Sequence, residues 1–137
     1  MSAFKKVLFI DDDFITVNIC QRMMNLVQFA DEFIASDDGQ QAKDYLLGHM
    51  EDLPGIIFVD LHMTVMNGWE FLEWFENWLT AENLSIPIYV LSSSLSREDF
   101  ERAYIYKKVS GYIIKPMTSE HLKEAIEKFA GKSWFIL

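Results

Sequence analysis

The sequence has little cysteine, little positive charge and no long hydrophobic run. Cys20 is the one cysteine among 137 residues, so the chain cannot form a disulfide within itself, and a reducing, cytoplasmic location is expected. Lysine and arginine number 12 against 21 aspartates and glutamates, which leaves a net charge of −9. Nucleic acids and anionic membranes are both held through cationic contacts to phosphate, so neither is expected as a partner.

The apolar residues occur in short stretches. None approaches the roughly 20 consecutive apolar residues of a membrane span, and the stretch at 7–10 is too short for a secretory signal. Internal repeats and low-complexity segments are absent. A length of 137 residues, half of them apolar, suffices for one domain with a hydrophobic core and is too short for two.

Five apolar runs alternate with longer amphipathic segments. The runs cover residues 7–10, 32–35, 56–59, 87–91 and 111–114. Continuous runs of this length are typical of parallel strands buried on both faces. Asp13, Ser96 and Thr118 are expected to cap three of the intervening helices, and Gly131 to end the last one. The alternation predicts an α/β fold, a doubly wound, five-stranded parallel sheet of (βα)₅ type with right-handed crossovers.

Apolar residues at helical spacing predict which helix faces are buried. In the first helix the expected inner residues are Thr16, Ile19, Cys20, Met23 and Val27. In the fourth they are Phe100, Ala103 and Tyr104. The helix after Gly68 is rich in aromatic residues, and Trp74 and Trp78 are expected to flank its buried face rather than to anchor a partner.

Chemically reactive side chains follow four of the five predicted strands. Asp11 and Asp12 follow the first strand, Asp60 ends the third, Ser92 follows the fourth, and Lys115 follows the fifth. Carboxyl ends of parallel strands meet at one edge, where open α/β sheets bind ligands. Crowded carboxylates attract a cation, and an oxygen-only donor set favours Mg²⁺, with Mn²⁺ as an alternative. With a lysine and a hydroxyl nearby, the set predicts phosphoryl transfer to Asp60 as nucleophile.

Each of these residues also has an ordinary structural explanation. An aspartate often caps the next helix, as we expect of Asp13, a serine after a strand often bonds within its own turn, and Lys-Pro is often a solvated turn. Their joint placement on four strand ends favours the functional interpretation.

The sequence resembles the receiver domain of two-component response regulators, from residue 5 to about residue 130. The matching pieces are Asp11-Asp12, Asp38-Gly39 with Ala42, the segment 60–68, the segment 87–92 and Tyr112 to Pro116. The resemblance implies a flavodoxin-like sheet with strand order 2-1-3-4-5. It also implies one receiver domain over residues 1–137, ending in a short apolar tail at 131–137.

The resemblance implies a role for each residue at the strand ends. Asp60 matches the phosphorylated aspartate. Asp12 matches a direct Mg²⁺ ligand, Asp11 a ligand acting partly through water, and the backbone carbonyl of His62 a third protein ligand.

Three further positions match residues that sense the phosphoryl group. Ser92 matches the hydroxyl that bonds one phosphoryl oxygen, and Lys115 matches the lysine that pairs with another. Tyr112 matches the aromatic switch residue that turns inward when the hydroxyl moves. The bond between Lys115 and Pro116 matches one that is often cis in the family.

The sequence departs from the family pattern after the phosphorylation site. The usual Met-Pro is Met63-Thr64 here, which removes no ligand. His62 and Ser94 occupy the two positions that tune the lifetime of the phosphoryl group in the family, and this pair does not predict a lifetime.

A receiver is a signalling switch rather than a metabolic enzyme, and it is expected to lose its phosphoryl group by its own catalysis. The expected donor is a sensor histidine kinase or a histidine phosphotransfer protein, with Ile15 as a candidate contact or, equally, a residue tucked under a loop. The expected output face is the fourth helix, fifth strand and fifth helix. Because only six residues follow Gly131, the target is expected to be another protein, and the apolar tail 134–137 is expected to fold back on the last helix.

Three other classes of protein share part of this pattern. A haloacid-dehalogenase-type phosphatase needs a second aspartate where His62 stands. A flavodoxin needs a hydroxyl- and glycine-rich loop where this chain has three aspartates. A receiver that acts as a scaffold without phosphorylation stays open, although every reactive residue is present.

Overall fold

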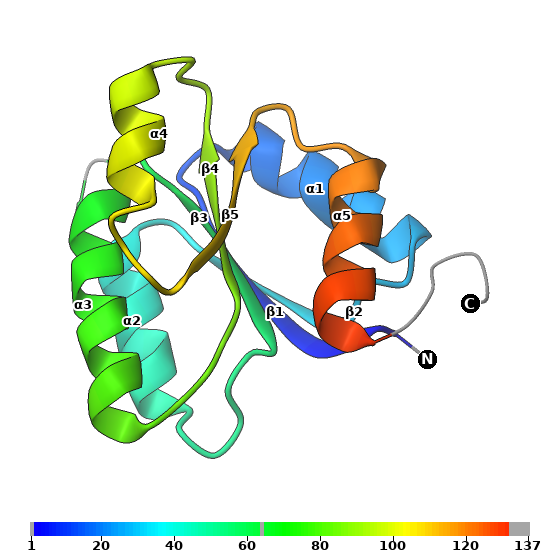
Figure 1. Ribbon diagram of the computed structural model, residues 1–137. Coiled ribbons are helices and arrows are strands. Elements are labelled where there is room, and N and C mark those ends of the chain that lie inside the picture. The colour runs from blue at the N-terminus through cyan, green and yellow to red at the C-terminus, as the bar shows by residue number, and fades with distance from the viewer. Residues whose placement is uncertain (1, 64, 132–137) are drawn as a thin grey trace.

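One parallel sheet organises the computed structural model, which describes residues 2–63 and 65–131 (Figure 1). The order of the strands is β2-β1-β3-β4-β5, so the predicted fold class and strand order are confirmed. The strands are β1 (Phe4–Ile10), β2 (Ala30–Ser36), β3 (Ile56–Asp60), β4 (Ile88–Ser92) and β5 (Val109–Ile114). The sheet places β1 directly beside β3, which makes their carboxyl ends the topological switch point.

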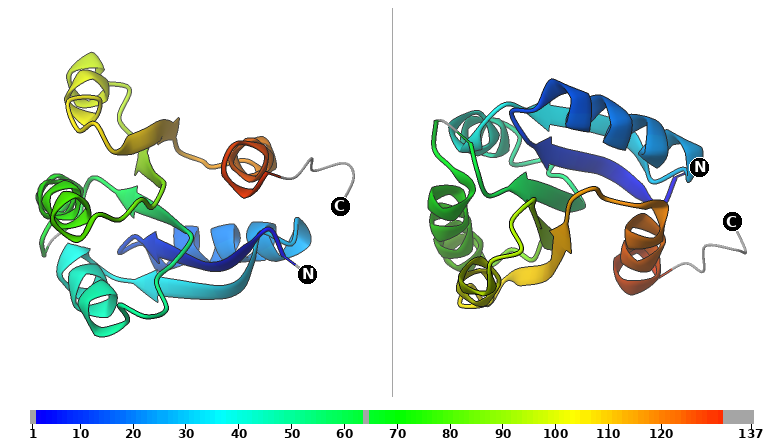
Figure 2. Two further views of the ribbon diagram at one scale, coloured as in Figure 1. Left: turned by 60° about the horizontal axis from the view of Figure 1, so that its bottom comes forward. Right: turned by 90° about the horizontal axis from the view of Figure 1, so that it is seen from above.

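Helices cover both faces of the sheet. They are α1 (Phe14–Leu26), α2 (Gly39–Gly48), α3 (Gly68–Glu82), α4 (Arg97–Ala103) and α5 (Ser119–Ala125), the last continued by a π-helical turn, Ile126–Ala130. Helices α1 and α5 lie on one face, and α2, α3 and α4 on the other (Figures 1 and 2). Within the described residues, no helix is both long enough and apolar enough to cross a membrane.

Two hydrophobic cores lie on the two faces of the sheet because successive strand residues point in opposite directions. Val7, Phe9 and Phe58 pack toward α1 and α5. Leu8 and Val59 pack toward α2 and α3. All residues of β3 and β4 are buried, as the continuous apolar runs predict.

Three strands begin earlier than predicted. β1 starts at Phe4, β2 at Ala30 and β5 at Val109. Parallel pairing extends the first two, since Phe4 lies opposite Ala30 and Lys6 opposite Glu32. The charged and small residues at these strand starts break the apolar runs, so the pattern alone understated the strands.

Two predicted inner faces need correction. In α1 Cys20 and Met24 are buried, whereas Ile19 is 55% exposed. In α4, which has only seven residues, Ala103 is buried but Phe100 and Tyr104 are about half exposed. Helical spacing allows either side of an apolar stripe to face inward, and packing against α5 and β5 selects the side.

The predicted helix ends are confirmed. The Asp13 carboxylate accepts a hydrogen bond from the Ile15 N–H at 3.1 Å, and Ser96 Oγ accepts one from the Asp99 N–H. Thr118 is the N-cap of α5, where His121 Nδ1 accepts from the Thr118 N–H. Gly131 ends the last helix in the left-handed conformation that favours glycine.

Candidate functional site at the carboxyl ends of the strands

The predicted site residues gather at one edge of the sheet. Asp11 follows β1, Asp60 is the last residue of β3, Ser92 is the last residue of β4, and Lys115 follows β5. Lys115 Nζ lies 2.8 Å from Asp11 Oδ2 and 3.5 Å from Asp60 Oδ2. Residues more than 100 positions apart in the sequence thus form one charged cluster.

Burial and charge together perturb this cluster. Asp11 and Asp60 are buried, while Asp12 is exposed. Burial, reinforced by the negative charge of Asp11, raises the pKa of the Asp60 carboxyl to about 6, and Lys115 opposes that rise. Burial alone would lower the pKa of Lys115, but the Asp11 hydrogen bond and the charges of both carboxylates hold its pKa above the usual value. One ammonium group therefore serves two buried carboxylates.

The three aspartates fit a divalent cation. One carboxylate oxygen from each of Asp11, Asp12 and Asp60 lies within 4.8 Å of the others. The donors are all hard oxygens, the type preferred by Mg²⁺ and Mn²⁺. Burial and the negative charge of Asp11 both raise the pKa of Asp60, and a cation at this position would favour the ionised carboxylate. Within the described residues, the histidines His49, His62 and His121 contribute to no such cluster.

Close backbone contacts hold Asp60 in place. A Cβ atom on Gly68 would lie 2.5 Å from the Asp60 carbonyl oxygen, so α3 can start against β3 only with glycine there. The Gly68 N–H donates to the Leu61 carbonyl at 3.1 Å. Gly39, at the start of α2, similarly donates to the Met66 carbonyl at 3.0 Å. Both ends of the loop after Asp60 are thereby tied to helix starts.

Ser92 and Tyr112, the two predicted switch residues, lie on the neighbouring strands β4 and β5. Ser92 is fully buried, and its Oγ accepts a hydrogen bond from the Ser94 N–H at 3.0 Å. The Tyr112 ring meets Phe100 of α4 edge-on at 5.4 Å. Its hydroxyl is buried and has no hydrogen-bond partner among the described residues. The Lys115–Pro116 bond is cis, as expected from the resemblance.

The loop after Asp60 also reaches α4. His62 Nε2 lies 3.6 Å from Asp99 Oδ2, although the His62 side chain is 56% exposed. Asp99 lies in the first turn of α4. No spacing rule connects it to His62, because the contact depends on how the loops after β3 and β4 pack. Thr64, the family departure in this loop, lies outside the described residues.

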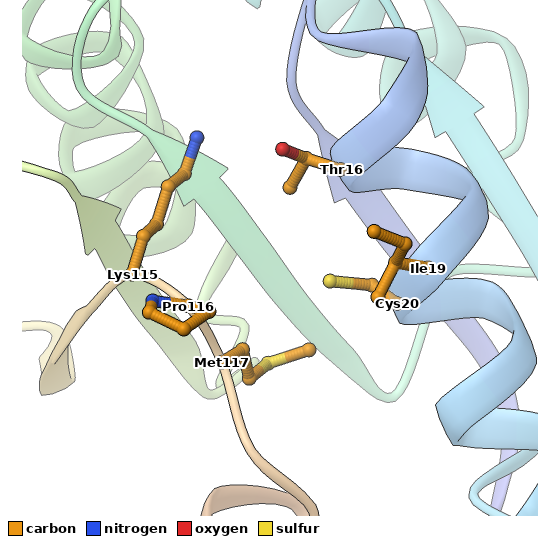
Figure 3. Close-up of a pocket in the computed structure, with 6 residues that line it drawn as sticks. All are labelled: Thr16, Ile19, Cys20, Lys115, Pro116 and Met117. Atoms are coloured by element: carbon orange, nitrogen blue, oxygen red, sulfur yellow. The ribbon is translucent and has the colours of Figure 1, made fainter.

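An apolar pocket of about 260 Å³ adjoins Lys115, and sequence reasoning missed it. Figure 3 shows Thr16, Ile19 and Cys20 of α1 facing Lys115, Pro116 and Met117 across it. Cys20 is buried, as predicted, and burial raises the pKa of its thiol to about 11. The pocket forms because the loop after β5 passes beside α1, which helical periodicity cannot reveal.

Comparison with known proteins places the chain in a family. Residues 7–127 match the model of the response regulator receiver domain. The chain therefore belongs to that family, whose members are phosphorylatable switches of two-component signalling rather than classical enzymes. Receiver domains take phosphoryl groups from kinases and act on downstream targets.

Similar proteins agree with this assignment. A probable methanogenesis regulatory protein, FilR2 of Methanothrix harundinacea, is 31% identical over 126 residues, which cover 89% of this chain and 79% of that protein. A two-component response regulator from Cytophaga hutchinsonii superposes with a TM-score of 0.85 at 27% identity, covering 94% of this chain and 98% of that one. The phosphorylated cyanobacterial phytochrome response regulator RcpA is 25% identical, with a TM-score of 0.70 and coverage of 90% and 89%.

Proposed function

We propose that Asp60 accepts a phosphoryl group from a phosphohistidine, in the presence of Mg²⁺, as one step of a two-component system or phosphorelay. The observation that carries the proposal is the position of the Asp60 carboxylate. It lies at the end of a buried strand, beside Asp11 and 3.5 Å from Lys115 Nζ. In this proposal residues 1–137 form a single receiver domain with a core at about 5–130.

Each residue has a defined part in the transfer. An oxygen of the ionised Asp60 attacks phosphorus, the P–N bond to the donor imidazole breaks with its electron pair leaving on nitrogen, and an acyl phosphate forms. Lys115 Nζ then pairs with a phosphoryl oxygen, and the Ser92 hydroxyl donates to another. Attack by water on phosphorus then breaks the P–O bond to the carboxyl oxygen, releases inorganic phosphate and restores the carboxylate, which resets the switch.

The proposed metal ligands are the carboxylates of Asp11, Asp12 and Asp60 and the backbone carbonyl of His62, with Mn²⁺ able to replace Mg²⁺. A divalent ion at this position would neutralise charge on the phosphoryl oxygens and on the crowded acids.

The phosphodonor is proposed to dock over α1 and the loop after β5. A sensor histidine kinase or a histidine phosphotransfer protein must cover this rim to bring its histidine to Asp60. Phe14, Ile15 and Ile19 are 77%, 67% and 55% exposed, so Ile15 is not tucked under a loop. They lie on the same helix as the pocket shown in Figure 3, which offers space for an apolar donor side chain. Such a donor implies a cytoplasmic location.

The output is proposed to pass through α4, β5 and α5 to a partner protein. Leu95, Ile105 and Ile114 are 83%, 72% and 44% exposed on or beside these elements. Movement of Ser92 toward a phosphoryl group would release its bond to the Ser94 N–H and shift the start of α4. Tyr112, packed edge-on against Phe100, would report that shift.

The test is intact mass after incubation with acetyl phosphate and Mg²⁺, comparing the wild type with Asp60→Asn. A single phosphoryl adduct that needs Mg²⁺ and is missing from the variant is the expected result. An adduct that persists in Asp60→Asn would overturn the assignment. No adduct with acetyl phosphate or with a phosphorylated histidine donor would leave the scaffold interpretation instead. Amide exchange over residues 93–118, measured with and without a phosphoryl mimic, tests the output face.

A further inference from the structure

A groove separates α3 from α4, on the opposite face of the sheet from the donor-docking helix α1, and it shares α4 with the proposed output face. It has a volume of about 580 Å³. Its lining residues come from the start of α3, the loop before it and the end of α4: Met66, Asn67, Trp69, Glu70, Glu73, Trp74, Arg102 and Tyr106. Figures 1 and 2 show α3 and α4 as neighbours on the same side of the sheet.

Two cationic side chains already lie over the tryptophan rings of this surface. The Arg102 guanidinium carbon is 4.2 Å from the centroid of the Trp69 ring. Lys43 Nζ of α2 is 5.5 Å from the centroid of the Trp74 ring. Both distances are within the range of cation–π attraction. The aromatic surface of α3 therefore attracts positive charge from both of its neighbours within the chain.

The charge of α3 reinforces this attraction. Between Gly68 and Glu82 the helix has four glutamates and no lysine or arginine. Glu70 is engaged in the helix cap, since its Oε1 accepts from the Asn67 N–H. Glu73 faces the groove beside Tyr106, and burial together with the Glu73 charge raises the pKa of the Tyr106 hydroxyl. Of the two glutamates that line the groove, Glu73 is the one that takes no part in the helix cap.

We propose that the groove between α3 and α4 docks a cationic segment of a partner protein, one arginine or lysine of which takes the place of Arg102 over Trp69 and pairs with Glu73. Charge complementarity identifies the occupant. Aromatic faces and a carboxylate match a guanidinium or ammonium group, and the net charge of −9 favours a basic partner. Without a partner in the groove, the Arg102 guanidinium occupies the position over Trp69 that the partner's cationic group would take.

The test follows the indole N–H signals of Trp69 and Trp74 by NMR while acetyl-Arg-Leu-Arg-amide is added to the unphosphorylated chain. Saturable shifts at these two indoles and at groove amides are expected. The same peptide with citrulline in place of arginine should give none. Because no phosphodonor is present, the outcome is independent of whether Asp60 is phosphorylated.

Matched variants locate the binding. Glu73→Gln should weaken the affinity by about threefold or more, the scale of a partly exposed ion pair. Glu82→Gln removes the same charge from the far end of the same helix and should leave the affinity unchanged. Arg102→Ala should strengthen binding, because it removes the competing cation. Equal effects of the two glutamine variants, weaker binding to Arg102→Ala, or shifts spread over the whole acidic surface would overturn the proposal.

Discussion

At the amino-end edge of the sheet, one buried lysine has every donor position filled. Lys6 Nζ donates to Tyr45 Oη at 2.8 Å, to the Asp52 carbonyl at 2.9 Å and to Asp52 Oδ2 at 2.8 Å. At the opposite edge one lysine, Lys115, faces Asp11 and Asp60 with Asp12 nearby. The amino-end charges are balanced within the protein, whereas the carboxyl-end charges are not.

This difference separates a structural charge cluster from a reactive one. A buried ammonium group with three hydrogen bonds needs no further ligand. Three carboxylates with one ammonium group have an excess of negative charge, which a cation can neutralise and which a phosphoryl group cannot approach without one. Buried charge alone is therefore a weak indication of function, and unbalanced buried charge at a ligand-binding edge is a stronger one.

The largest effect is expected from tightening the backbone at the carboxyl-end edge. Gly68→Ala places a Cβ atom 2.5 Å from the Asp60 carbonyl oxygen and 2.6 Å from Leu61 Cα. Overpacking against backbone should lower the free energy of unfolding by about 3 kcal/mol. Urea denaturation measures this loss. In the control Gly48→Ala the new Cβ meets no atom within 4 Å, and stability should rise by roughly 0.5 kcal/mol. Equal stability of the two variants would contradict the close contact.

The second prediction concerns pH and Asp60. The folded-state pKa of about 6 lies above the ordinary value of 3.8, so the unfolded chain loses this proton first as the pH rises. The associated loss of stability develops between about pH 4 and pH 6 and stays constant above that. Without divalent ions, Asp60→Asn should therefore raise the free energy of unfolding at pH 7.5 by roughly 2 kcal/mol.

At about pH 3 the advantage of Asp60→Asn should be nearly lost, because the wild-type carboxyl is then mostly protonated in both the folded and the unfolded state. Added Mg²⁺ should stabilise the wild type more than the variant, since the variant lacks one carboxylate of the cluster. If the stability difference between the two proteins did not depend on pH, the pKa of Asp60 would not be raised by burial and by Asp11. Denaturation series at several pH values decide the point.

The third prediction tests the balanced edge. Lys6→Met removes three hydrogen bonds. Because Asp52 is about half exposed and water can solvate its carboxylate, the free energy of unfolding should fall by only about 1.5 kcal/mol. The rate of phosphorylation by acetyl phosphate should not change. The neighbouring Lys5 is 79% exposed and 3.9 Å from the same aspartate, and Lys5→Met should alter neither quantity. A slower phosphorylation rate in Lys6→Met would contradict the claim that the Lys6 cluster is purely structural and independent of the reactive edge.

The smallest effect is expected where charge is screened by water. His62 and Asp99 are 3.6 Å apart, with side chains 56% and 24% exposed. A double-mutant cycle of His62→Gln and Asp99→Asn should give a coupling free energy below about 0.5 kcal/mol. Dephosphorylation rates of the same four proteins would show whether Asp99 acts on the phosphoryl group through His62. A coupling well above that value would mean that the loop after β3 and α4 move as one unit.

Strand ends could be predicted from the sequence because their signals are local. Four apolar residues lead directly to Asp60, and Lys115-Pro116 follows an apolar run, so periodicity and strand length suffice. The Asp13 cap was predictable for the same reason, since its side-chain carboxylate bonds to Ile15 and Thr16, two and three residues further along the chain. The tail 134–137, which was expected to fold back on the last helix, lies outside the described residues.

Contacts between distant segments could not be predicted in this way. Lys6 lies outside the predicted first strand at 7–10, yet it is buried because α2 and the loop after it bring Tyr45 and Asp52 to it. Trp74 and Trp78 were expected at the edge of a buried face, and the structure stacks them at 5.1 Å with Trp78 buried. Ile19 was expected inside and is exposed.

The sequence by itself determined the βα alternation, the strand-end residues and the sign of the protein's charge, because each depends on composition and short spacing. The tertiary structure decided which helix faces are buried, which lysine balances which carboxylate, and where the pocket beside Lys115 and the groove between α3 and α4 form. Those features depend on how helices and loops far apart in the chain pack against one another, and no local pattern encodes that packing.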